Sequence, residues 1–193
     1  MHRKIGRAQE QATPLIKTML NQLLDNCDNS VMGIRNQVLL RLGYETMRRR
    51  SELCAFRFKD ISEAPNGKPV IRLNFSKTDQ FGTGKIIPIS EVLLTLLHQW
   101  KNIVGDNGYV LRSIRRHGNI GKHLSPSSVS VILKTLQATI HYDKTTPPLS
   151  GHSFRVGAAL DLLEQGEPLE RIMLRGGWQG DATAMKYLRS WTC

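Results

Sequence analysis

The chain has 193 residues and 21.8 kDa, with 27 Lys and Arg against 16 Asp and Glu, a formal net charge of +11. This length predicts one domain, and 40% hydrophobic residues allow a substantial core, which excludes wholesale disorder. The charge predicts a polyanionic partner, either nucleic acid or an anionic membrane surface. No apolar run approaches the roughly 18 residues of a membrane span, and residues 1–4 lack a signal-peptide core, so we expect neither spanning nor secretion.

The cysteines and histidines form no metal or disulfide pattern. Cys27, Cys54 and Cys193 lie far apart without CxxC spacing, which argues against a disulfide framework and a zinc finger. The histidines form no HExxH motif, and only His117 and His123, close together in a basic loop, leave a minor metal alternative. We therefore expect reduced thiols in a cytoplasmic or nucleoid compartment, and chemistry without a bound metal or cofactor.

The first third of the chain predicts two helices. Residues 1–11 are polar and basic without periodicity, which is typical of a linker. Thr13 followed by Pro14 predicts a helix start, because threonine caps helices and proline suits the first helical position. A second helix runs to about Met47 after the break at residues 28–30. The apolar positions of the two predicted helices are Leu15, Ile16, Met19, Leu20, Leu23 and Leu24, then Ile34, Val38, Leu39 and Leu42.

Residues 56–89 carry strand signals instead. Alternation at residues 56–58 and β-rich runs at 70–75 and 85–89 predict three strands. Turn residues separate them, at Pro65–Gly67 and at Phe81–Gly84. This region therefore predicts a small three-stranded antiparallel sheet.

Helical patterns return after the sheet. Capping residues, prolines and glycines bound helices at about residues 91–104, 125–141, 151–164, 168–175 and 181–189. The fold class is therefore mostly α with one small three-stranded antiparallel sheet, an α+β domain.

The positive charge is concentrated in two places. No acidic residue lies between Asp106 and Asp143, and the stretch from 112 to 123 also contains two glycines, which predicts a mobile basic loop suited to phosphate-backbone contact. A solvated surface loop is the alternative. The basic residues of this loop are Arg112, Arg115, Arg116 and Lys122. The second cluster, Arg48-Arg49-Arg50, closes the second predicted helix, where cations would also be favoured by the helix dipole.

Four further motifs carry chemistry. His152 and Arg155 share one face of a helix start, where free backbone N–H groups favour an anion. The others are Gly176-Gly177-Trp178 with Tyr187 nine residues after the tryptophan, Arg49 to Leu53, and Lys77 beside the hairpin turn. Each alone is ambiguous, since such residues are also common in cores, on amphipathic helices and in turns.

Together and in this order, these motifs resemble the catalytic domain of the tyrosine recombinases, the phage-type integrases. The match runs from about Ile34 to Arg189 and is densest from Leu149 onward, in Ser150–Ser153, Arg155–Ala159 and Gly176–Trp178. The resemblance implies a tyrosine recombinase catalytic-domain fold over residues 12–193. It also implies a site-specific recombinase or integrase that cuts and rejoins DNA by transesterification.

The resemblance assigns a role to each matching residue. Tyr187 is the nucleophile that forms a 3′-phosphotyrosyl link, Arg49 and Arg155 hold the non-bridging phosphate oxygens, and Lys77 is the general acid for the 5′-oxygen. His152 donates to the phosphate or takes the tyrosine proton. Trp178 donates its indole N–H, and Glu52 orients Arg49 or His152. Arg48 and Arg50 are left as DNA-backbone candidates. Because the protein link conserves the phosphodiester energy, neither ATP nor a metal is required.

The resemblance also sets expectations for partners and alternatives. Relatives carry an N-terminal core-binding domain, so this chain is expected to be a catalytic domain alone. We expect the full-length protein to act as a tetramer on double-stranded DNA, within the bacterial nucleoid or from a phage or other mobile element, and this fragment to be monomeric. The alternatives are a type IB topoisomerase and a non-catalytic DNA-binding relative.

Overall fold

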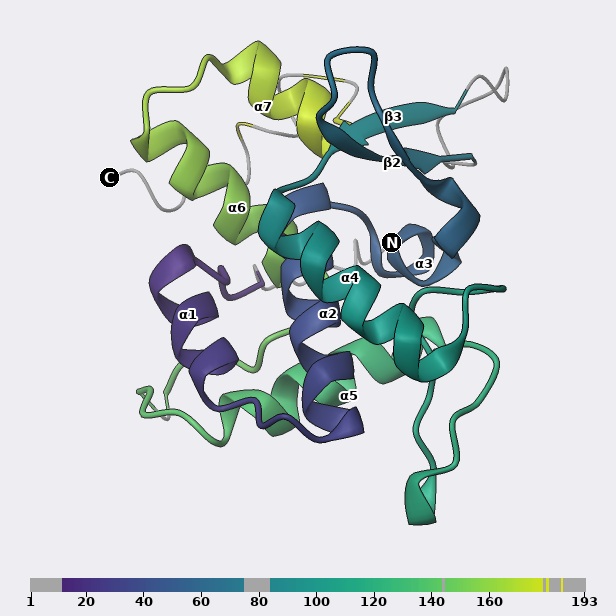
Figure 1. Cartoon of the computed structure of the whole chain (residues 1–193). Coiled ribbons are helices and arrows are strands. Elements are labelled where there is room, and N and C mark those ends of the chain that lie inside the picture. Colours follow the sequence, from purple (N-terminus) through teal and green to yellow (C-terminus); the bar gives the residue numbers. More distant parts are fainter. Residues whose placement is uncertain (1–11, 75–83, 144, 179, 181–184, 186–193) are drawn as a thin grey trace, which may run out of the picture.

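The computed structural model describes residues 12–74, 84–143, 145–178, 180 and 185 (Figure 1). Its three-stranded sheet consists of β1 (Ile61–Glu63), β2 (Pro69–Leu73) and β3 (Lys85–Pro88), with short 3₁₀ turns η1 (Phe58–Asp60) and η2 (Arg116–Gly118). The α-helices are α1 (Lys17–Asp25), α2 (Val31–Thr46), α3 (Arg50–Ala55), α4 (Glu91–Val104), α5 (Pro126–Gln137), α6 (Ser153–Glu164) and α7 (Leu169–Gly176). The prediction of a mostly α fold with one small antiparallel sheet is confirmed.

Helix α2 lies at the centre of the molecule and packs against α1, α4 and α6 (Figure 1). Ser30 caps its N-terminus by accepting from the amide of Gly33. The side chains predicted to face inward are buried, namely Ile34, Val38, Leu39 and Leu42. Among the described helices, none is long and apolar enough to cross a bilayer.

The sheet has the order β1-β2-β3 and presents two different faces. Ile71 of β2 lies opposite Ile87 of β3, and both are buried toward the helices. Leu73 lies opposite Lys85, so the lysine side chain shares this inward face. The neighbouring pair, Arg72 and Ile86, is exposed on the outward face.

The strand predicted at residues 56–58 is wrong. The first strand begins at Ile61, and η1 lies where the prediction placed the end of a strand. The carboxylate of Asp60 accepts the backbone N–H of Arg57 at 2.8 Å, which closes a tight turn before the sheet. A local side chain-to-backbone bond therefore outweighs the alternating pattern.

The helix start predicted at Thr13-Pro14 is also wrong. Thr13 donates its hydroxyl to the carbonyl of Pro147 at 2.8 Å, and Leu15 donates its amide to the carbonyl of Ser153 at 3.0 Å. This segment therefore runs extended beside the start of α6, and α1 begins at Lys17. The amide of Lys17 donates to a carboxylate oxygen of Asp161 at 2.7 Å, so a residue of α6 caps α1.

The sequence had suggested that the arginine triplet at residues 48–50 closes the second helix, and this prediction is wrong. Helix α2 ends at Thr46, Met47 adopts a left-handed conformation with φ 54°, and a new helix, α3, begins at Arg50. The triplet therefore joins two helices, and Arg49 occupies the N-cap position of α3. The dipole of α2 does not explain these cations.

Helix α5 begins as predicted, with Ser125 as its cap, and ends at Gln137 rather than near residue 141. The helix predicted at 181–189 lies outside the described residues, apart from Met185.

Candidate active site

The residues predicted to hold a phosphate come from three separate elements that meet in space. Arg49 and His152 are the N-cap residues of α3 and α6, and both line one cavity of about 410 Å³. Arg155 lies in the first turn of α6, and Trp178 follows the end of α7. Lys77 and Tyr187 lie outside the described residues, so their predicted roles stay predictions.

Glu52 orients Arg49. One carboxylate oxygen of Glu52 pairs with Arg49 Nη1 at 3.2 Å, and the other accepts the Arg49 backbone N–H at 3.2 Å. The glutamate is buried in the first turn of α3, where the helix dipole favours a negative charge. Of its two predicted partners, Arg49 and His152, the hydrogen bonds go to Arg49.

Arg155 is held against an aromatic ring. Its guanidinium lies 4.6 Å from the ring centroid of Trp178, and the residue is only 2% exposed. A guanidinium stacked in this way loses freedom while its N–H groups keep their charge and direction. Trp178 therefore supports the arginine through its ring face.

The two glycines before Trp178 make this contact possible. A Cβ on Gly176 would lie 2.0 Å from an atom of the Trp178 ring, so only glycine lets the ring fold back over the end of α7. Gly177 ends α7 in a left-handed conformation with φ 70°, which favours glycine. The Gly-Gly-Trp sequence thus fixes the place of the indole.

His152 is neutral near physiological pH in the free protein. Burial, followed by the charges of Arg155 and Arg49, lowers the pKa of His152 to about 4. A neutral imidazole can accept a proton, which an imidazolium cannot. The arrangement therefore keeps His152 in its neutral form, in which one ring nitrogen can accept and the other can donate a hydrogen bond.

Sequence reasoning missed Lys85. This half-buried residue begins β3 on the inward face of the sheet, and burial together with Arg48 and Arg155 lowers the pKa of its amine to about 8, against the opposing charge of Glu52. The signal that could have found it is the strand alternation, which places Lys85 on the face of Ile87. Lys85 adds a cation to the cluster around Arg155.

Arg48 is not the DNA-backbone contact that the sequence had suggested. It is 3% exposed, and its guanidinium points inward, where Nε donates to the carbonyl of Thr46 at 2.9 Å and Nη2 donates to the carbonyl of Arg175. Its neighbour Arg50 is exposed and lines the same cavity as Arg49 and His152.

The basic loop is a hydrogen-bonded hairpin rather than an irregular loop. Ile114 bridges Ile120, and Arg115 donates its amide to the carbonyl of Asn119 at 2.9 Å. Figure 1 shows the hairpin projecting away from the body of the molecule, with η2 at its tip. Three of its four cations are exposed, namely Arg115, Arg116 and Lys122.

Arg112, the fourth cation, has a structural role. Its guanidinium donates to the carbonyl of Tyr109 at 3.1 Å, to that of Val104 at 2.9 Å and to that of Asn107. Val104 is the last residue of α4, so Arg112 satisfies a carbonyl at that helix end. Its predicted DNA contact is not supported by this placement.

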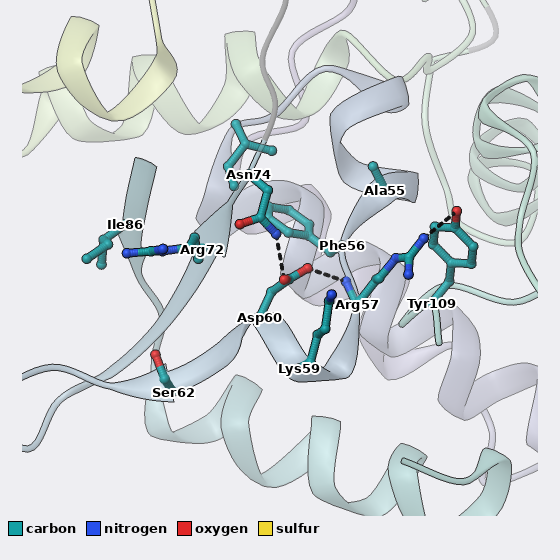
Figure 2. A pocket seen from close by; sticks show the side chains of 11 residues that line it. Ala55, Phe56, Arg57, Lys59, Asp60, Ser62, Arg72, Asn74, Ile86 and Tyr109 are labelled. Carbon is teal, nitrogen blue, oxygen red and sulfur yellow. Dashed lines mark hydrogen bonds between the residues drawn. The ribbon is translucent and has the colours of Figure 1, made fainter. Parts of the chain in front are cut away.

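A second cavity, of about 890 Å³, opens on the outward face of the sheet. Figure 2 shows Arg57 lying against Tyr109, with its guanidinium carbon 4.7 Å from the ring centroid and a hydrogen bond of 3.2 Å to the hydroxyl. Lys59 and Arg72 add two exposed cations to the lining. The lining carboxylate, Asp60, is buried and occupied by the Asn74 amide at 2.6 Å and the Arg57 backbone. This cavity therefore presents a net positive charge.

Within the part of the chain that the structure describes, no group of three or more His, Cys, Asp or Glu side chains is arranged to hold a metal ion.

Comparisons with known proteins place these features in context. The sequence profile of the phage integrase family matches residues 15–192. The chain is 28% identical to recombinase cre of Escherichia phage P1, over 96% of this chain and 58% of that protein. It is 27% identical to the integrase/recombinase xerD homolog of Selenomonas ruminantium, over 97% of this chain and 57% of that protein. The chain thus spans a little over half the length of these relatives.

Solved structures show the same fold. The XerA recombinase superposes with a TM-score of 0.69 at 18% identity, covering 96% of this chain and 61% of that one. A lambda integrase dimer bound to a COC′ core site superposes with a TM-score of 0.70 at 19% identity, covering 96% of this chain and 50% of that one. The predicted tyrosine recombinase catalytic-domain fold is therefore confirmed.

Proposed function

The chain belongs to the phage integrase family, the tyrosine recombinases, and from this membership we propose that it is the catalytic domain of a site-specific recombinase that cuts and rejoins DNA. The observation that carries the proposal is the convergence of Arg49, His152 and Arg155, with the arginines oriented by Glu52 and Trp178. Two fixed guanidiniums beside a neutral imidazole match the charge and proton demands of a phosphodiester transfer.

The proposed reaction exchanges one phosphodiester for another. The Tyr187 hydroxyl attacks the scissile phosphorus, forming a Tyr Oη–P bond while the P–O5′ bond breaks. His152 accepts the tyrosine proton, and Lys77 gives a proton to the departing 5′-oxygen. Arg49 and Arg155 offset the charge that develops on the non-bridging oxygens. In the reverse step a 5′-hydroxyl attacks the phosphotyrosine and releases the enzyme, so the bond energy is conserved without ATP.

The proposed partner is double-stranded DNA. Exposed cations on the hairpin (Arg115, Arg116 and Lys122) and Arg50 beside the cavity are suited to the phosphate backbone. Among proteins of the same fold, a lambda integrase tetramer has been solved on a Holliday junction. We propose the same assembly for the full-length protein, and a monomer for the 193-residue chain.

A nicked suicide substrate tests the proposed function. After cleavage of such a DNA, the short fragment that carries the 5′-hydroxyl diffuses away and cannot reverse the reaction. The parent chain is therefore expected to accumulate a covalent adduct, visible by denaturing gel electrophoresis. Tyr187→Phe removes the nucleophilic oxygen and is expected to leave no adduct. An adduct that persists in Tyr187→Phe, or a parent that never forms one on cleavage sites selected with the full-length protein, would refute the proposal.

The same substrates separate recombination from the alternative topoisomerase activity. A recombinase transfers the cleaved strand to a second DNA that carries the site, whereas a topoisomerase relaxes a supercoiled plasmid without exchanging partners. Relaxation without any strand exchange by the full-length protein would favour the alternative.

A further inference from the structure

Two arginines connect the junction between α2 and α3 to the end of α7. Arg48, in the junction, donates Nη2 to the carbonyl of Arg175 in the last turn of α7. Arg175 donates Nε and Nη2 in the opposite direction, to the carbonyl of Glu45 at 3.3 and 3.2 Å. Arg48 Nε also donates to the carbonyl of Thr46 at 2.9 Å. We call this reciprocal pair, Arg48 and Arg175, the arginine clasp.

The clasp satisfies backbone groups that the helices leave open. The last carbonyls of a helix have no intrahelical partner. Here the carbonyl of Glu45 in α2 accepts from Arg175, and the carbonyl of Arg175 in α7 accepts from Arg48, two residues after the end of α2. Burying a guanidinium is unfavourable unless its N–H groups find acceptors, and Arg48 is 3% exposed. A Cβ on Gly177 would lie 2.8 Å from Arg48 Nη1, so the arginine also occupies the space that this glycine leaves.

The clasp is connected to both arginines assigned to the phosphate. Arg48 immediately precedes Arg49, and Trp178, three residues after Arg175, supports Arg155 at 4.6 Å. Met47 and Trp178 also pack in one buried cluster. Hence the clasp and the Met47–Trp178 packing both connect the backbone next to Arg49 with the ring that contacts Arg155.

We propose that Arg48 and Arg175 are positioning residues, which hold Arg49 and the Trp178–Arg155 pair in the geometry needed for phosphoryl transfer. The inference rests on the proposed function, and neither residue is assigned a contact with DNA. A displacement of about 1 Å at a catalytic group can slow a reaction about a hundredfold. Loss of the clasp therefore slows cleavage of bound DNA and leaves the affinity for DNA nearly intact.

The clasp differs from a simple electrostatic effect of a buried cation. Arg48 uses two nitrogens, Nε and Nη2, for acceptors on two different helices. A lysine keeps the charge and offers one nitrogen, so Arg48→Lys tests geometry against charge. Arg175→Met breaks the same connection from the other side.

The experiment measures single-turnover cleavage of the suicide substrate with protein in excess, for Arg48→Met, Arg48→Lys, Arg175→Met and the double variant Arg48→Met/Arg175→Met. We expect each single variant to cleave roughly ten- to a hundredfold more slowly, with DNA affinity within about twofold of the parent because the phosphate contacts remain. The double variant is expected to be no slower than the slower single variant, because both residues serve one connection. Arg171→Met, a change at an exposed arginine of α7 whose side chain is 76% exposed, is the matched control.

Hydrogen exchange supplies a readout that does not depend on cleavage. The amides of Gly177 and Trp178 donate to the carbonyl of Met173 at 2.8 and 3.1 Å, and they are expected to exchange faster in Arg48→Met and Arg175→Met than in the parent. If Arg48→Met does not fold, Arg48→Lys and Arg175→Met carry the test. A parent that forms no adduct would refute the proposed function alone, and the exchange rates would still decide the clasp. The inference would be overturned if a folded Arg48→Met variant cleaved at the parental rate, or if Arg48→Lys restored that rate. It would also be overturned if the effects of the two single variants added in the double variant, or if the amides of Gly177 and Trp178 exchanged at the parental rate.

Discussion

His152 shows how one residue's environment decides its chemistry. Burial and the charges of Arg155 and Arg49 hold its pKa at about 4, well below the usual value of 6.5. The same two arginines are assigned to the phosphate, so the cations that attract the substrate also keep the imidazole unprotonated. A phosphate anion bound beside the arginines would weaken their repulsion and raise the pKa of His152, in the direction that its proposed role as acceptor of the tyrosine proton requires.

The pKa of His152 predicts a pH-dependent stability. Because the folded-state pKa is depressed, the unfolded chain binds more protons, and the free energy of unfolding decreases as the pH falls from about 6.5 to about 4. Above about pH 6.5 this contribution is fully present. Urea unfolding at several pH values is expected to give a shallower acid slope for His152→Gln than for the parent. His141→Gln, a change at an exposed histidine, is the control that keeps the parental slope. Identical slopes in the parent and in His152→Gln would contradict the assignment.

Two lysines, Lys77 and Lys85, are candidates for proton donation to the 5′-oxygen. A 5′-bridging sulfur leaves as a thiolate without needing a proton, so it rescues only the loss of the general acid. We expect Lys77→Ala to cleave the oxygen substrate at least about a hundredfold more slowly and the sulfur substrate at nearly the parental rate. Lys85→Met is expected to slow both substrates equally, because Lys85 serves as a cation near Arg155. Rescue of Lys85→Met instead would assign the proton to Lys85.

At the scale of elements, the end of α7 determines where Trp178 lies. A methyl group on Gly176 would lie 2.0 Å from the ring, so Gly176→Ala must move the indole away from Arg155. Overpacking of this kind destabilises by about 1–3 kcal/mol. We expect that loss in urea unfolding, together with slower cleavage. Gly180→Ala, where a Cβ meets open space, is the control. A Gly176→Ala variant of parental stability and rate would contradict this account of the motif.

Helix starts capped by serine were predicted correctly, whereas starts that depend on a distant partner or on an unusual cap residue were not. Helices α4 and α5 are capped by Ser90 and Ser125, whose hydroxyls accept from amides three residues ahead, a signal present in the sequence. Thr13 has the same local signal, but its hydroxyl bonds to the carbonyl of Pro147. The short helix α3 was not predicted as a separate helix because its start depends on Glu52 closing back onto Arg49.

The residues of the candidate site also fall into those that were predicted from the sequence and those that were not. His152, Arg155 and Trp178 were picked out through the resemblance to the tyrosine recombinases, and the structure brings them together with Arg49. Alternation places Lys85 on the inward face of β3, but its proximity to Arg48 and Arg155 depends on tertiary packing, so it was missed. Arg48 was assigned to the surface because nothing adjacent in sequence reveals its acceptor on α7, 127 residues away.

At the scale of the whole molecule, the cations behind the net charge of +11 include a buried set and an exposed set. Arg48, Arg155 and Lys85 are buried or half-buried around Glu52, where they form a fixed positive site. Other cations are exposed, among them those of the projecting hairpin and of the cavity on the outward face of the sheet. Buried cations are little screened by salt, whereas exposed cations are screened strongly.

This division predicts how salt affects DNA binding. Removing one cation that pairs with a DNA phosphate lowers the slope of log K against log[salt] by about 0.9. The double variant Arg115→Gln/Arg116→Gln is therefore expected to bind more weakly and to lower the slope by about 2.

The double variant Arg57→Gln/Lys59→Gln tests the cavity of Figure 2 in the same way, and a comparable fall in the slope would extend the DNA contact to that face. Arg171→Gln, at an exposed arginine paired with Glu167, keeps the parental slope. Fluorescence anisotropy with a labelled duplex between about 50 and 200 mM salt measures all three. A parental slope in Arg115→Gln/Arg116→Gln would show that the hairpin does not contact the backbone.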